Sequence, residues 1–262
     1  MHAAIGKVII PMSLTIYIVS AVSVFFFSGL LAMAGLGAAF IFVPLFYYLG
    51  VPLAEAVPAA LLLNVVSLMF AAVNYYRGGL INWRIGLPIM ITAVLLAPLG
   101  AHMTPFVDKR LFLSMFAGFL VFAGFMMLFY KPTLRTKELN RAVESGAGAA
   151  VGCVAGFLGG LLGVGGGNFI VPVLNWLGMD AKVAAGTTAM VVVFASLSGF
   201  LGHVTLGGLS PVFLGVMAVM SALGSIVGSQ MMKTSISSSQ LKKIIGVLLM
   251  VIAAKMIFDI VK

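Results

Sequence analysis

The sequence predicts an all-α polytopic membrane protein built from two inverted repeats of about five membrane segments each. Three observations lead to this fold class. The 262 residues are 62% hydrophobic and only 8% charged, with a mean hydropathy of +1.22. The apolar residues form ten segments, and the two halves of the chain resemble each other at an offset of 128 positions. Soluble domains carry about 25% charged residues, so lipid must form part of the solvent around this chain.

Each half contains four long apolar segments and one short segment. The long segments are 12–33, 54–75, 84–105 and 111–130, then 145–163, 182–203, 210–232 and 240–261. The short segments are 40–50 and 168–178. About 20 residues suffice to cross a bilayer, whereas a short segment rises only about 16 Å. The short segments therefore either are re-entrant, or begin inside the membrane and still leave it.

The internal repeat divides the chain. Glycines and prolines recur in the same order 128 positions apart: Gly35 with Gly163, Gly37 with Gly165, Val43-Pro44 with Val171-Pro172, and Leu49-Gly50 with Leu177-Gly178. A "GGL" at 78–80 recurs at 207–209, where the offset is 129. We expect a first transmembrane repeat over 1–130, a polar cytoplasmic linker over 131–143 and a second repeat over 144–262.

The basic residues distinguish between four and five crossings per half. With five crossings, ten of them share one side: Arg77, Arg84, Lys131, Arg135, Lys137, Arg141, Lys182, Lys233, Lys242 and Lys243. Four lie on the other side, namely Lys7, Lys109, Arg110 and Lys262, and Lys255 falls inside the last helix. Four crossings would split the basic residues eight against six. Cytoplasmic loops carry the excess of Lys and Arg. Five crossings are therefore favoured, with inverted halves, both termini outside the cytoplasm, and a multi-pass location in the cell (inner) membrane.

Glycine clusters precede both short segments. Gly35 and Gly37 come before residue 40, and a longer run of glycines comes before residue 168: Gly163, Gly165, Gly166 and Gly167. In an inverted pair, two short helices that start near the midplane bring their N-termini together. A helix N-terminus exposes unpaired N–H groups and a partial positive charge, and a bound anion can satisfy both. We expect these glycines to line an anion site. Asn168 could either cap the short helix or contact the ligand.

Three further polar residues are candidates for substrate contacts. Thr187 and Thr188 could donate to an anion or bond back to helix carbonyls, and Asn64 could bind substrate or join two helices. Isolated glycines such as Gly118, Gly124 and Gly224 are expected to serve helix packing.

The remaining titratable residues exclude several classes of function. All six acidic residues fall in loops or near helix ends, whereas cation exchangers usually place carboxylates inside the membrane. This fits an anionic substrate and leaves the coupling ion unknown. Neither a His/Asp/Glu cluster with metal-ligand spacing nor a nucleophile–base pair is visible, so we expect no enzyme activity, no cofactor and no metal. The net charge of +9 is attributed to cytoplasmic loops rather than to nucleic-acid binding.

Two motifs in the second half, "GFLGGLLGVGGGNFIVPVL" and "AAGTTA", together with the doubled architecture, resemble the TauE/SafE sulfite exporter family. The resemblance covers nearly the whole chain. The first half departs from it, with "AGLGAAF" in place of "GVGGGNF" and "AVPAALL" in place of "AAGTTAM", so the resemblance does not imply a symmetric site.

The resemblance implies transport of a small sulfur-containing anion, such as sulfite, thiosulfate or a sulfonate like sulfoacetate. A secondary transporter that works by alternating access is the leading hypothesis, and an anion channel or a membrane-embedded enzyme is the alternative. The expected partners are the lipid bilayer and the anionic substrate. The sequence leaves the direction of transport and the oligomeric state open, with a homodimer as one option.

Overall fold

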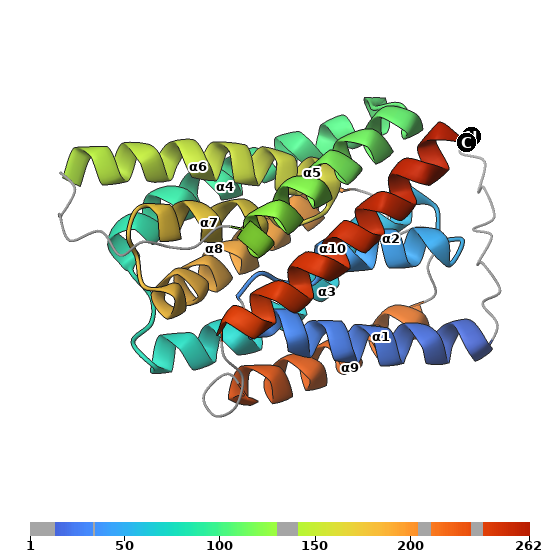
Figure 1. Cartoon of the computed structure of the whole chain (residues 1–262), viewed down its shortest axis with the longest axis horizontal. Helices are drawn as coiled ribbons and strands as arrows, with labels where there is room; N and C mark the ends of the chain where they lie inside the picture. Colours follow the sequence, from blue (N-terminus) through green and yellow to red (C-terminus); the bar gives the residue numbers. More distant parts are fainter. Residues whose placement is uncertain (1–13, 34, 130–140, 204–210, 232–237) are drawn as a thin grey trace, which may run out of the picture.

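The computed structural model (Figure 1) describes residues 14–33, 35–129, 141–203, 211–231 and 238–262. Within these ranges the chain forms ten α-helices, one 3-10 turn and no strand. The helices are α1 (Leu14–Ala32), α2 (Ala39–Tyr48), α3 (Leu53–Arg77), α4 (Trp83–Met103), α5 (Lys109–Phe129), α6 (Arg141–Leu162), α7 (Gly167–Trp176), α8 (Ala181–Gly202), α9 (Pro211–Met231) and α10 (Ser238–Val261), and the turn is η1 (Thr104–Phe106). The ten predicted segments are therefore confirmed, with their ends displaced by a few residues.

Eight of these helices are long and apolar enough to span a membrane, which confirms the predicted polytopic fold. The two short helices, α2 and α7, have 10 residues each and rise about 15 Å. The spans keep large apolar side chains on their outer faces, such as Leu95 at 65% exposure and Leu201 at 70%. Exposing such an apolar surface to water costs free energy, whereas exposing it to the hydrocarbon of a bilayer does not. Most of the expected linker, residues 131–140, and the second "GGL" lie outside the described residues.

Corresponding helices of the two halves make corresponding contacts. Helix α1 packs on α9 as α6 packs on α4, and α3 packs on α9 as α8 packs on α4. Helices α3 and α8 pack on each other, and so do α5 and α10. In Figure 1, α1 runs from right to left and α6 from left to right, and the start of α1 lies at the same end of the molecule as the end of α10. A two-fold relation between the halves would produce this pattern.

Small residues allow the long helices to approach closely. Along α6, Gly148, Gly152, Gly156 and Gly160 recur at every fourth position. A Cβ on Gly156 would lie 2.5 Å from the Ala93 carbonyl oxygen of α4, so no larger residue fits there. This run of small residues is visible in the sequence as a glycine at every fourth position of α6.

The isolated glycines behave differently from one another. Gly224 lies against the backbone of Phe25 in α1, and Gly124 lies against Met250 in α10, so a packing role is confirmed for both. For Gly118 the packing expectation is wrong, because a Cβ there would meet no atom of the described structure within 4 Å. Gly118 instead lies on the outer surface of α5.

Gly156→Leu is expected to lower the free energy of unfolding by about 1–3 kcal/mol, because the leucine side chain would force α4 and α6 apart. Thermal unfolding of the purified protein in detergent measures this effect. Gly118→Leu is the matched control, and its melting temperature should stay within a degree or two of the wild type. Equal losses in the two variants would contradict the packing described here.

Candidate functional site

The two glycine breaks meet at one buried side chain, Asn64 of α3. Gly37 lies against the Asn64 amide, and a Cβ on Gly165 would be 2.5 Å from both Asn64 Nδ2 and Ser196 Oγ. Asn64 is eleven residues into α3, which places it about 17 Å along this helix. The breaks that precede α2 and α7 are therefore brought together near the middle of the bundle.

The backbone at both breaks requires glycine. Gly35 and Gly37 have φ of 67° and 73°, and the glycines 128 positions later, Gly163 and Gly165, have φ of 73° and 71°. L-residues rarely adopt this left-handed region. The contacts also repeat at the same offset. Gly35 lies against Ala185 of α8, and Gly163 lies against Val57 of α3, the equivalent position in the other half.

Asn64 caps the first short helix. Its Oδ1 accepts a hydrogen bond from the Ala39 backbone N–H at 3.3 Å, and its Nδ2 donates to Ser196 Oγ at 2.9 Å. Ala39 is the first residue of α2, so one of the N–H groups that a helix start leaves unpaired gains a partner. Asn64 thus joins α2, α3 and α8. Asn64 is expected either to bind substrate or to join two helices, and the structure shows it joining helices.

The second short helix lacks this cap. The residue 128 positions after Asn64 is Val192, whose side chain accepts no hydrogen bond, and the residue equivalent to Ala39 is Gly167. The first backbone N–H of this turn with a partner is that of Phe169, which donates to the Gly166 carbonyl at 3.0 Å. Within the described structure, the backbone N–H groups of Gly166, Gly167 and Asn168 have no acceptor.

Two buried polar side chains without partners accompany these N–H groups. Asn168 and Thr188 are both fully buried. Neither polar atom of the Asn168 side chain has a hydrogen-bond partner in the described structure, and the Thr188 hydroxyl has none either. Asn168 lies ten positions before Gly178 and Thr188 ten positions after it, and Gly178 is in the turn between α7 and α8. Both residues therefore lie at a similar height along this pair of helices. Such groups are costly in a membrane core, and a ligand at the start of α7 would satisfy them.

Several predicted roles change with this geometry. Asn168 does not cap α7, because Gly166 is the N-cap residue and no side chain bonds to it. The reason is that Asn168 is already the second residue of the helix. Thr187 Oγ1 accepts from the Asn82 backbone N–H at 2.9 Å and so holds the loop before α4. Thr188 is therefore the threonine whose hydroxyl remains without a partner.

The glycine run is closely packed in this conformation. A Cβ on Gly166 would lie 2.6 Å from the Ala155 carbonyl oxygen of α6, and a Cβ on Gly167 would lie 2.5 Å from the Leu36 carbonyl oxygen. Gly166, which the sequence predicts to line an anion site, borders the α6 backbone, so a larger residue there would disturb packing and ligand binding together.

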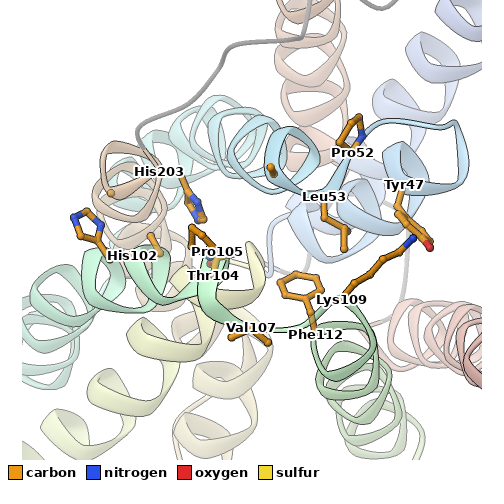
Figure 2. A pocket seen from close by; sticks show the side chains of 13 residues that line it. Tyr47, Pro52, Leu53, His102, Thr104, Pro105, Val107, Lys109, Phe112 and His203 are labelled. Atoms are coloured by element: carbon orange, nitrogen blue, oxygen red, sulfur yellow. The ribbon is translucent and has the colours of Figure 1, made fainter.

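A cavity of about 560 Å³ opens near the end of α6 (Figure 2). Its wall combines apolar, basic and hydroxyl side chains with three small residues, and it consists of Tyr47, Pro52, Leu53, Ala54, Ala101, His102, Thr104, Pro105, Val107, Lys109, Phe112, Gly202 and His203. These residues lie at the ends of α2, α4 and α8 and at the starts of α3 and α5. Because successive helices run in opposite directions across the bundle, the cavity lies at the end of the bundle where α1 begins.

The cavity lies close to the second glycine break. His203 Nε2 is 3.0 Å from the Gly160 carbonyl oxygen, and Thr104 Oγ1 donates to the Leu161 carbonyl at 2.9 Å. These carbonyls end α6, where a helix leaves acceptors without internal partners. On another wall, Leu53 lies one helical turn before Val57, which contacts Gly163. The sequence indicates only that His203 lies near a helix end, because its partner lies on a different helix.

The described acidic side chains lie at helix ends, as the sequence predicts. Among the described residues, no group of three His, Cys, Asp or Glu side chains could hold a metal ion. Glu55 lies in the first turn of α3, Asp180 is the N-cap of α8, and Asp259 lies in the last turn of α10. Carboxylates are thus absent from the middle of the described helices.

Comparison with known proteins places this geometry in context. The family model for "Sulfite exporter TauE/SafE" matches residues 20–256. The probable membrane transporter protein YdhB of Bacillus subtilis is 28% identical over 198 residues, covering 74% of this chain and 81% of that protein. The probable membrane transporter protein y4hK of Sinorhizobium fredii is 27% identical over 208 residues, covering 77% and 82%.

A shorter match links the chain to a plant protein. "Sulfite exporter TauE/SafE family protein 1" of Arabidopsis thaliana is 33% identical over 84 residues, which cover 32% of this chain and 19% of that protein. No solved structure gave a significant match.

The two asparagines at the breaks should respond differently to replacement by leucine. Asn64→Leu leaves the Ala39 N–H and Ser196 without their partner, and we expect a loss of about 1–3 kcal/mol in the free energy of unfolding. Asn168→Leu removes an amide that has no partner, so stability should stay level or rise. Thermal unfolding without added anions measures both. A larger loss for Asn168→Leu than for Asn64→Leu would contradict the assigned contacts.

Proposed function

Because this chain belongs to the TauE/SafE sulfite exporter family, we propose that it is a secondary transporter of a small sulfur-containing anion. The class includes sulfite, thiosulfate and sulfonates such as sulfoacetate. Several relatives are named as probable membrane transporters, and this agrees with a transporter rather than an enzyme.

The start of α7 is the observation that carries the proposal. Three backbone N–H groups without acceptors and the Asn168 amide offer hydrogen-bond donors at the start of α7, and the unpartnered Thr188 hydroxyl lies at a similar level of the α7–α8 pair. The helix start adds the equivalent of roughly half a positive charge. Anions bind at such helix starts in many proteins, and the described bundle has no carboxylate at this depth to repel them.

Alternating access of two inverted halves is the mechanism that fits this site. The paired contacts of corresponding helices and the opposite courses of α1 and α6 in Figure 1 support an inverted arrangement. In transporters of that kind, broken helices hold the substrate near the midplane while one half moves against the other. The glycine run, tightly packed here, would loosen to admit the anion, and the cavity near Lys109 would be its entrance from one side.

Transport by purified protein in liposomes tests the role of the α7 start. Asn168→Leu and Thr188→Val should each lower the rate of sulfite or sulfonate uptake at least about tenfold, the effect of losing about 1.4 kcal/mol of interaction. Their melting temperatures should not fall, since neither side chain has a partner to lose. Asn175→Leu is the matched control. Asn175 is also buried in α7, with an Oδ1 that has no partner, but it lies at the far end of the helix.

Two results would contradict this role. One is normal transport by Asn168→Leu, and the other is an equal loss in Asn175→Leu. Counterflow separates the carrier from the alternative, an anion channel, because only a carrier accelerates uptake when unlabelled anion is present on the far side.

The proposed topology has both termini outside the cytoplasm of a cell-membrane protein. It follows from the ten-to-four distribution of basic residues and the positive-inside bias. A reporter fused after Lys262 should report the outside, and one inserted between residues 131 and 140 should report the cytoplasm. Identical signals from both positions would disprove the five-plus-five arrangement.

A further inference from the structure

Two side chains in the cavity wall also hold the end of α6. Thr104 donates to the Leu161 carbonyl, and His203 Nε2 bonds to the Gly160 carbonyl at 3.0 Å. Gly163, the first residue of the second glycine break, follows only three positions after Gly160. Whatever binds in this cavity therefore contacts groups that hold the helix immediately before the break.

The contact with Gly160 determines which nitrogen of His203 carries hydrogen. A carbonyl oxygen only accepts, so Nε2 must be the donor. In the neutral ring, Nδ1 is then an acceptor, which repels an anion. In the imidazolium, Nδ1 gains a proton and becomes a charged donor, while the bond from Nε2 to Gly160 is kept. Protonation thus converts the same ring, in the same position, from an unfavourable to a favourable anion contact.

We infer that His203 in its protonated form binds the anion in this cavity, so that each anion bound is accompanied by one proton taken up from solution. The inference rests on the proposed anion transport and extends it by naming the coupling ion. The proton moves from solvent to Nδ1, and no other bond forms or breaks.

The groups around the cavity favour this linkage. The residues that line it include no carboxylate, and the titratable ones are Tyr47 from α2, His102 from α4, Lys109 from α5, and His203 itself. Lys109 Nζ lies 5.3 Å from the centre of the Tyr47 ring, and Figure 2 shows its side chain reaching across the wall toward Tyr47. Other described titratable residues on the elements around the cavity include Tyr48 on α2, Glu55 on α3, Asp108 and Arg110 at the start of α5, and Cys153 on α6.

The empty cavity disfavours the charged form of His203. Burial lowers the pKa of the His203 imidazole, and the neighbouring His102 lowers it further, whereas the Gly160 carbonyl acts in the opposite direction. A bound anion adds an attractive charge and raises this pKa. By linkage, the anion and the proton strengthen each other's binding by the same factor. Anion affinity should therefore fall as the pH rises from the pKa of the free protein toward that of the complex.

Isothermal titration calorimetry on the purified full-length protein tests this. The probes are methanesulfonate, propane-1-sulfonate and benzenesulfonate, which stay fully ionised between about pH 5 and 8, the range in which His titrates. For the wild type, we expect Kd to rise by up to about tenfold per pH unit. Titrations in two buffers with different ionisation enthalpies should show proton uptake on binding. A wild-type Kd that does not change with pH, without proton uptake, would overturn the inference even where binding is strong.

Two variants assign the proton to its residue. His203→Gln keeps a donor for the Gly160 carbonyl but cannot titrate, so its Kd should be weak and independent of pH. His102→Gln, in the same wall, should keep both the pH dependence and the proton uptake, and loss of proton uptake in this variant alone would contradict the assignment. If His203→Gln does not fold, the wild-type titrations still decide. If none of the three sulfonates binds at any pH, the proposed transport function fails as well.

Discussion

The structure depends on one constraint, that each polar backbone group inside a membrane needs a partner. Two glycine breaks interrupt the helices near the middle of the bundle, and each break exposes carbonyls and N–H groups. The end of α6 is satisfied from within the protein by Thr104 and His203, whereas Asn64 satisfies only one N–H group at the start of α2, that of Ala39. The start of α7 has no such partner among the described residues. In hydrocarbon, that imbalance favours a bound ligand.

The repeat is symmetric in its backbone but asymmetric in its polar side chains. Equivalent glycines have almost the same φ, and Gly35 and Gly163 make equivalent contacts. At the breaks, however, each polar side chain has an apolar equivalent 128 positions away: Asn64 with Val192, Asn168 with Phe40, and Thr188 with Ala60. The first half therefore caps one N–H group of its short helix, whereas the second half has no such cap and also leaves the Asn168 amide and the Thr188 hydroxyl without partners. This division gives the bundle one candidate anion site, although the fold is doubled.

Hydropathy, glycine spacing and the internal repeat were enough to predict the ten helices and the meeting of the two breaks. The pairing of side chains could not be predicted, because it depends on how helices distant in sequence are rotated against each other. Asn64 finds Ser196 on α8, and His203 finds Gly160 on α6, and neither pair has a signature in the sequence. The contact of Gly166 with Ala155 on α6 could not be predicted for the same reason.

Hydrogen–deuterium exchange tests the central claim, that the free donors at the start of α7 bind the anion, most directly. The purified protein would be compared with and without saturating propane-1-sulfonate, following peptides that cover residues 163–170 and the equivalent residues 35–42. Exchange should slow in the segment 163–170, because the ligand accepts its free N–H groups. It should stay unchanged in the segment 35–42, where Asn64 caps the Ala39 N–H and the apolar residues Phe40 and Ala60 stand in place of Asn168 and Thr188. Equal protection of both segments, or protection of the first half alone, would contradict the account.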